Sequence, residues 1–276
     1  MCLRLSFELN GNNMLMMDRN ESSDINFYGK VYGTGNAMLV GNPQELQVNA
    51  AVTTNRNTNF VYITNATASA ASNQFIKFID KTPRRFVQDS INVISEYERL
   101  QQEMEEEETK TDIRLNLLID ATPDATMKII MDPIAGDYIS GKGSGNIRTE
   151  FFNKGDVKMF GNYRISQGIY KFSLQEVIRK DFIIKDGSSI TFNGPPLDAT
   201  LNIQASYTVN SASLNDLIPD AADPITQQPN VKVNCIMNLT GILWRPNIKL
   251  GIELPNERDE IQTLVRNYIS TEEQMN

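Results

Sequence analysis

Residues 197–209 alternate strictly between apolar and polar side chains. The odd positions hold Leu, Ala, Leu, Ile, Ala, Tyr and Val, whereas the even positions hold Asp, Thr, Asn, Gln, Ser and Thr. Side chains of a β-strand point alternately to two faces, so this segment predicts a strand with one apolar and one polar face. At about 3.3 Å per residue it would span roughly 43 Å, well beyond a usual strand.

The same alternation recurs through most of the chain and predicts a mainly β protein with a long, mostly antiparallel sheet. The first ten residues alternate and then reach Asn10-Gly11, which predicts a strand that enters a turn. Gly41-Asn42-Pro43 predicts a second turn. Further strands are predicted at 25–31, 46–52, 59–64, 74–79, 113–119, 127–131, 138–151, 157–165, 168–172, 182–184, 190–192, 231–243 and 248–254.

Two segments have helical spacing instead. Apolar residues recur at intervals of three and four within 90–108, which predicts an inserted amphipathic helix, with a solvated loop as the alternative. Residues 256–274 show the same spacing and predict a C-terminal amphipathic helix. Four parts result: 1–83 as the N-terminal part of the sheet, 84–111 as a helical, acidic insertion, 112–255 as the main domain, and 256–276 as the C-terminal helix.

Glycines at 141, 143 and 145 lie inside one predicted strand. They lack the spacing of a phosphate-binding loop, and no helix follows them. We therefore predict a structural role, because glycine in a strand permits a bend or a close approach of backbones. Gly33-Thr34-Gly35-Asn36 resembles Gly143-Ser144-Gly145-Asn146, a weak internal echo that suits a sheet built from similar hairpins.

Composition offers little catalytic chemistry. The formal net charge of −8 argues against nucleic acid as a partner. Histidine is absent, so the commonest general base and metal ligand are missing. Cys2 and Cys235 are too far apart for a zinc motif, and Cys235 is in phase with apolar neighbours, which predicts a buried thiol. We expect no catalytic residues, no metal site and no cofactor, and no stretch is apolar enough to span a membrane.

The function then depends on what covers the apolar face. One hypothesis is a packed interior, as in a structural or adhesive envelope β-sandwich with a dry core. The other is a curled sheet whose open apolar groove binds acyl chains, and its small or flexible in-facing residues, such as Ala199 and Met237, favour this. A third, an envelope protein that binds or hydrolyses carbohydrate, is less well supported, because the single tryptophan, Trp244, falls in a predicted turn.

Four stretches resemble a known family when taken in order. They are Y-x-I-S-Q-G-x-Y-x-F at 163–172, F-x-I-x-x-G-S-S-I-T-F-N-G-P-P-L-D-A-T-L at 182–201, V-x-x-x-M-N-L-T-G-I-L-W-R-P and its flank at 231–246, and I-E-L-P-N at 252–256. This series is similar to the C-terminal domain of the TamB family, the inner-membrane component of the translocation and assembly module of diderm bacteria. The Met- and Asn-rich variant looks most like members from the Bacteroidetes.

The resemblance implies a β-taco, a U-shaped sheet with an apolar inside, in a non-catalytic periplasmic protein whose full-length form is anchored in the inner membrane. It implies an outer-membrane barrel of the Omp85 type (TamA or an equivalent) as partner, phospholipid acyl chains as cargo and nascent outer-membrane proteins as further clients. Because no anchor-like segment is present, we expect this chain to be the distal part of such a protein.

Carried onto this chain by alternation, and with the apolar face taken as the inside, the resemblance implies a set of groove-facing residues. The predicted groove set is Val157, Met159, Tyr163, Ile165, Leu197, Ala199, Leu201, Ile203, Ala205, Tyr207, Val231, Val233, Met237, Leu239, Leu243, Ile248, Leu250, Ile252 and Leu254.

Overall fold

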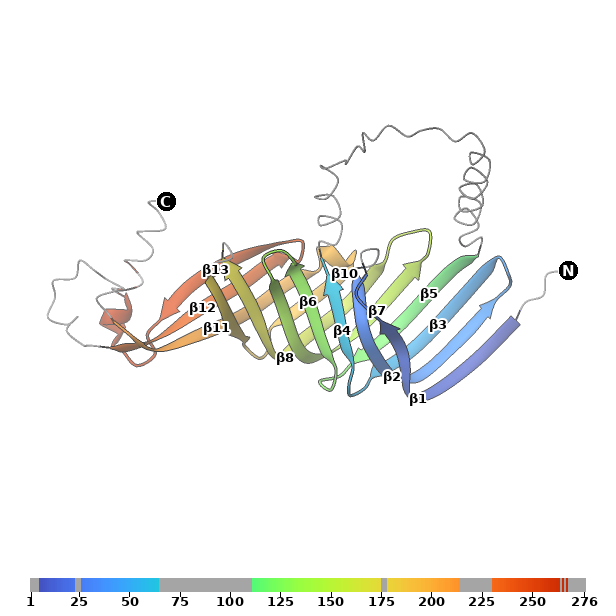
Figure 1. The fold of residues 1–276 in the computed structure, drawn as a ribbon, viewed down its shortest axis with the longest axis horizontal. Helices are drawn as coiled ribbons and strands as arrows, with labels where there is room; N and C mark the ends of the chain where they lie inside the picture. The colour runs from blue at the N-terminus through green and yellow to red at the C-terminus, as the bar shows by residue number, and fades with distance from the viewer. Residues whose placement is uncertain are drawn as a thin grey trace, which may run out of the picture.

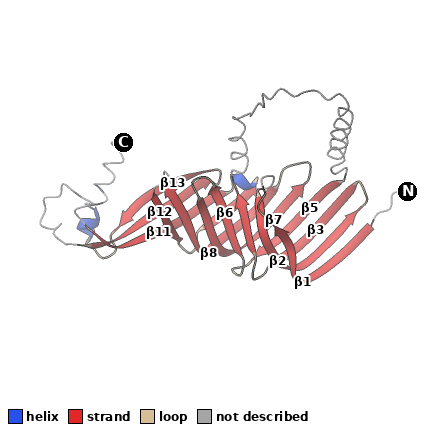
Figure 2. Cartoon of the chain, viewed as in Figure 1, coloured by secondary structure: helices blue, strands red, loops and turns tan. Residues whose placement is uncertain are grey.

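The computed structural model describes residues 5–22, 26–64, 111–174, 178–213, 230–263, 265 and 267. Strands make up nearly all of its regular structure, and Figure 2 shows them forming one elongated body with only short helical turns. The strands are β1 (Leu5–Arg19), β2 (Phe27–Gly41), β3 (Glu45–Thr54), β4 (Asn59–Ile63), β5 (Asp112–Ala121), β6 (Thr126–Asp132), β7 (Asp137–Phe152), β8 (Lys158–Leu174), β9 (Ile178–Ile184), β10 (Ser189–Gly194), β11 (Thr200–Ala212), β12 (Val231–Ile242) and β13 (Arg245–Glu253).

All thirteen strands belong to one sheet, and three consecutive pairs behave as single strands interrupted at a corner. A short turn at 55–58 separates β3 from β4, and the turns at 122–125 and 185–188 separate β5 from β6 and β9 from β10. The long strands beside them pass through the corner. β2 therefore pairs with β4 through Phe27–Lys30 and with β3 through Gly33–Gly41.

The corner divides the sheet into two walls. One wall contains β3, β5 and β10, and the facing wall contains β4, β6 and β9 (Figure 1). Because β2 and β7 pair with both walls, the pairing closes into a ring of six strands, β2-β3-β5-β7-β6-β4. The prediction of a mainly β, curled and mostly antiparallel sheet is confirmed. Among the described strands, only β3 with β5 and β4 with β6 pair in parallel.

Glycine makes the sharp curl possible on the inner face of β7. A Cβ added to Gly143 would lie 2.1 Å from the carbonyl oxygen of Arg164 on β8, and one added to Gly145 would lie 2.1 Å from that of Asn162. The ring of Tyr163 lies against Gly143 and fills the space that a side chain would otherwise take. The predicted structural role of these glycines is confirmed, and the similar Gly35 lies just as close to the backbone of β3.

Three local predictions are wrong. Asn10-Gly11 does not form a turn: β1 continues to Arg19, with an irregular register between Gly11 and Met14, where Asn13 takes a φ of 51°. The strands predicted at 157–165 and 168–172 are one strand, β8. β11 begins only at Thr200, because the residues Pro196–Asp198 form a 3-10 turn that contains Leu197.

Some predictions fall wholly or partly outside the described residues. These are the strand at 74–79, the inserted helix at 90–108 and most of the C-terminal helix, of which 259–263 are described and helical. The division into four parts stays a prediction. Within the part of the chain that the structure describes, no helix is long and apolar enough to cross a membrane.

Candidate functional site

The inner face of the sheet carries continuous rows of apolar side chains that cross many strands. On one wall, cross-strand pairing aligns Val52, Ile119 and Ile147 from β3, β5 and β7, and the row continues through Gly161 to Phe192 on β10. Directly opposed side chains on one face lie within contact distance, so such a row forms a single apolar surface.

The facing wall carries a second row, which is richer in aromatic residues. Its members are paired neighbours on successive strands, and aromatic contacts extend it to β11, where the Phe182 and Tyr207 ring centroids are 6.1 Å apart. Aromatic pairs at this separation stabilise by about 0.5–1.5 kcal/mol beyond their buried area. In order, the row is Phe27, Tyr62, Ile129, Ile139, Tyr170, Phe182, Tyr207, Cys235 and Ile252.

Between the two ends of the sheet, from β6 to β12, side chains of the two walls pack into one cluster. Ile203 and Met237, from β11 and β12, are 1% and 0% exposed and belong to one buried cluster with side chains of the facing wall. The remaining buried members of this central cluster are Ile129, Met131, Ile139, Ile147, Tyr163, Ile165, Tyr170, Phe182, Ile184, Ile190, Phe192, Ala199, Leu201, Ala205, Leu239 and Leu243.

The predicted groove set divides into three groups by burial. Ile248 and Leu250 on β13 are exposed, and Val157, Met159, Leu197, Tyr207 and Ile252 are half-buried. The assignment of the set to a lipid groove stays a prediction. Buried members are Tyr163, Ile165, Ala199, Leu201, Ile203, Ala205, Val231, Val233, Met237, Leu239, Leu243 and Leu254.

The inner face stays open at the two ends of the sheet. On β1, Leu5, Phe7 and Leu9 point to the apolar face, and Phe7, which is 57% exposed, is paired with Leu39 of β2. At the other end, Leu250 of β13 is 52% exposed and paired with the buried Met237. The alternation within 1–10 already carried the signal for β1, but the predicted groove set did not include these residues.

Burial perturbs the titration of the polar groups on the inner face. Burial raises the pKa of Tyr163 to about 12. Asp137 lies at the rim of the facing wall, where desolvation raises its pKa even though it accepts hydrogen bonds from the Ser173 N–H, at 2.7 Å, and from the Tyr170 hydroxyl. Burial and the nearby Asp137 raise the pKa of Tyr170.

The outer face is mainly polar, and hydrogen bonds join side chains of neighbouring strands on it. The Asn116 amide donates to the Asn49 side-chain oxygen at 2.8 Å, and the Asn162 amide donates to the Thr191 hydroxyl at 2.7 Å. Arg148 lies over the Phe160 ring, 4.8 Å from its centroid. Such a face remains hydrated while the opposite face holds the apolar side chains.

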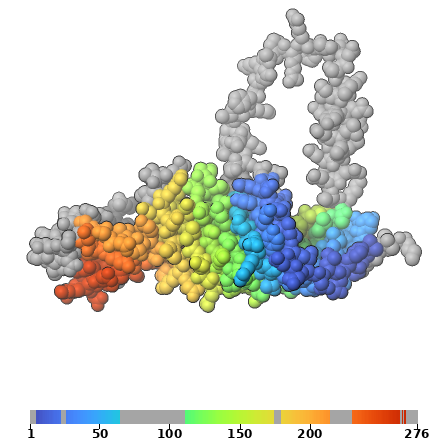
Figure 3. All heavy atoms as spheres, turned by 60° about the horizontal axis from the view of Figure 1, so that its bottom comes forward, coloured from blue at the N-terminus to red at the C-terminus, as the bar shows by residue number. Residues whose placement is uncertain are grey.

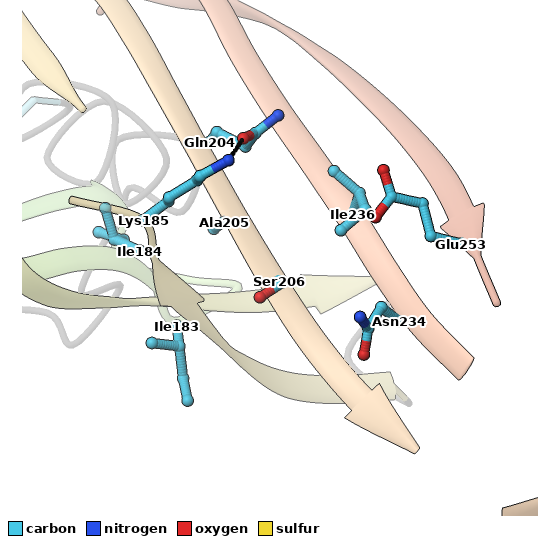
Figure 4. A pocket seen from close by; sticks show the side chains of 9 residues that line it. All are labelled: Ile183, Ile184, Lys185, Gln204, Ala205, Ser206, Asn234, Ile236 and Glu253. Carbon is cyan, nitrogen blue, oxygen red and sulfur yellow. Dashed lines mark hydrogen bonds between the residues drawn. The ribbon is translucent and has the colours of Figure 1, made fainter. Parts of the chain in front are cut away.

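A shallow hollow of about 390 Å³ opens on this outer side near β11 and β12. Figure 4 shows Lys185 at its border donating to the Gln204 side chain, and Ser206, Asn234 and Glu253 complete its polar lining. Ile183, Ile184, Ala205 and Ile236 complete the lining, and Ala205 also belongs to the predicted groove set.

The C-terminal end of the inner face has a second, smaller cluster. Leu254, Ile261 and Val265 pack on Val231 and Val233 of β12, and all five side chains are buried. In Figure 3 the C-terminal strands, in orange and red, lie at the end of the molecule opposite the blue N-terminal strands. Ile261 and Val265 come from the helical segment that begins at residue 259.

Among the described residues, no group of three or more acidic or cysteine side chains is placed to hold a metal ion. The Asp132 carboxylate instead accepts hydrogen bonds from the Ile134 and Ala135 N–H groups, as expected for a turn. Cys235 is a free, half-buried thiol rather than a fully buried one.

A family model described as the TamB C-terminal domain matches residues 3–275. No curated protein matches the sequence.

Proposed function

Because the chain belongs to the TamB C-terminal domain family, whose members serve the translocation and assembly module, we propose that it is a non-catalytic conduit segment in the periplasm. Its inner face would hold phospholipid acyl chains that pass between the inner and outer membranes. Family membership implies association with the cell envelope. An Omp85-type outer-membrane barrel as partner, nascent outer-membrane proteins as further clients and an inner-membrane anchor on the full-length protein are part of this proposal.

One observation carries the proposal: the apolar inner face runs across the whole sheet and is accessible at both ends. Phe7 and Leu9 are exposed on β1, and Ile248 and Leu250 are exposed on β13. Each buried CH₂ group of an acyl chain gains about 0.8 kcal/mol without requiring a particular headgroup. A surface of this kind binds many lipids with little selectivity, which suits a conduit.

The packed middle of the trough favours a second candidate. A structural or adhesive envelope protein with a dry core would have a cluster such as the one around Ile203, with both walls in contact. This candidate predicts that the exposed apolar residues at the ends bind no lipid in cells, and that the protein purifies free of lipid.

Site-specific photo-crosslinking in cells separates the two candidates. A benzoylphenylalanine in place of Phe7 or Leu250 would lie on the accessible apolar face, and one in place of Glu8 or Lys249 would lie one residue away on the polar face. We expect phospholipid adducts from the first pair, detected by mass spectrometry, and none from the second. These positions are exposed, so the replacement leaves the packed core intact.

Adducts confined to Phe7 and Leu250 would support the conduit. Equal yields at inner and outer positions would mean nonspecific contact with membranes, and no adduct at any of the four positions would favour the dry-core candidate.

A further inference from the structure

The C-terminal end of the apolar face is occupied by the chain itself. Val231 and Val233 form the floor there, and Ile261 and Val265 from the last described helical segment cover them. All four side chains are less than a tenth exposed. Residues 259–263 and 265 of this covering segment are described, and its two buried side chains belong to a much smaller cluster than the one that the walls share. We therefore expect the covering segment to be easier to displace than the walls of the trough.

A cation lies beside this covered floor on the facing wall. Lys180 of β9 is in phase with the inward Phe182, and its Nζ lies 3.4 Å from the Tyr207 hydroxyl and 5.0 Å from the centre of the Tyr207 ring. Among the described residues Lys180 forms no ion pair, unlike Lys171, which lies 3.9 Å from Asp181. The ammonium group is therefore not neutralised by a described carboxylate.

Cys235 connects the cation to the floor. It is directly paired with Tyr207, and its side chain packs against the cluster that contains Val231 and Val233. Burial raises the pKa of the Cys235 thiol, and the positive charge of Lys180 partly opposes this rise. Cys235 thus contacts the apolar floor and is also close enough to Lys180 for its charge to affect the thiol.

We infer that this end of the sheet is a seat for one anionic phospholipid, a proposal that rests on the proposed function. The acyl chains take the place of Ile261 and Val265 on the floor, and the phosphate is held by Lys180 and the Tyr207 hydroxyl. Exchanging protein side chains for acyl chains leaves the floor covered in both states, so the exchange exposes little apolar surface to water. An unpaired cation at the rim selects a ligand with an apolar body and an anionic head.

The thiol of Cys235 is a reporter built into the seat. In a Cys2→Ser background, its alkylation by iodoacetamide depends on how often the covering segment lifts, because the half-buried thiol must become fully accessible and must ionise. We expect Ile261→Ser combined with Val265→Ser to raise the alkylation rate about tenfold. Glu260→Gln, an exposed change on the same helical segment, should leave the rate unchanged.

The ligand test adds vesicles of phosphatidylethanolamine and phosphatidylglycerol to the uncovered variant. We expect the vesicles to restore slow alkylation, and Lys180→Gln to weaken this protection about fivefold. Lys185→Gln removes an outward lysine and should leave the protection unchanged. Inorganic phosphate alone should give no protection, and protection by phosphate would overturn the acyl-chain seat in favour of an anion site.

Failure of this inference is distinguishable from failure of the proposed function. Lipid adducts at Phe7 together with unprotected Cys235 would overturn the seat and leave the conduit standing. Absence of both would overturn both proposals. If the double variant does not fold, benzoylphenylalanine in place of the half-buried Ile252 of the parent chain takes over, with phospholipid adducts supporting the seat and their absence overturning it.

Discussion

Replacing Ile203 by alanine tests whether the middle of the trough is packed or open. Its side chain is 1% exposed, lies in the central cluster and is paired with Leu239, which is also fully buried. The change removes three carbon atoms, worth about 2.4 kcal/mol in transfer free energy, and leaves a cavity between walls that cannot fully collapse. We expect the free energy of unfolding to fall by about 3–4 kcal/mol.

The assay is urea unfolding followed by far-UV circular dichroism, with a second probe to establish that the transition is two-state. Asn202→Ala is the matched control, because this exposed neighbour points to the polar face of the same strand and should change stability by less than about 0.5 kcal/mol. A loss below about 1 kcal/mol for Ile203→Ala would refute the packed interior, because a side chain that borders an open groove loses few contacts.

Three further predictions concern Gly143 in β7, Ser188 in the turn at 185–188 and Asp137 at the rim of the facing wall. Gly143→Ala should destabilise by about 2 kcal/mol or more, because its Cβ meets a backbone oxygen, whereas Gly251→Ala, with nothing within 4 Å, should be neutral in the same urea assay. Ser188→Ala should cost about 1–3 kcal/mol, because the Gln204 N–H loses its 3.1 Å acceptor at the corner; an unchanged urea midpoint would contradict this. Burial raises the pKa of Asp137 above its ordinary 3.8, so the folded chain binds this proton more tightly than the unfolded chain, and the free energy of unfolding should fall as pH rises from 3.8 through the raised pKa. Asp137→Asn should remove that part of the pH profile, measured as urea midpoints, and an identical profile in the variant would contradict the assignment.

Alternation predicted which side chains of β11 are buried and which are exposed. Leu201, Ile203 and Ala205 are all buried, and Asn202 between them is exposed, as period two requires. The role of Gly141, Gly143 and Gly145 in β7 could also be predicted. Three successive inward positions without a side chain indicate that another backbone approaches the strand closely.

The corner could not be predicted, because it depends on pairing between distant segments. β3 and β4 look like two ordinary strands joined by a turn, and only their shared neighbour β2 makes them one interrupted strand. The irregular register at Asn13 also depends on a distant segment. The Asn13 backbone N–H donates a hydrogen bond to the Thr34 hydroxyl, 21 residues away, at 3.0 Å. Asn10-Gly11 therefore stays in the strand, despite a dipeptide that favours a turn.

Alternation also could not decide between a packed and an open interior, and the structure has both in one molecule. The ends expose apolar residues such as Phe7, whereas the walls touch in the central cluster that contains Ile203. Opening the middle to water would be prohibitive, because each fully buried large side chain contributes about 1.5–3 kcal/mol. Opening it to an acyl chain replaces one apolar contact by another, so most of that cost disappears. Under the proposed function, a lipid would therefore pass the central cluster only by direct exchange with core side chains, and the same packing that excludes water would keep the passage closed when no lipid is present.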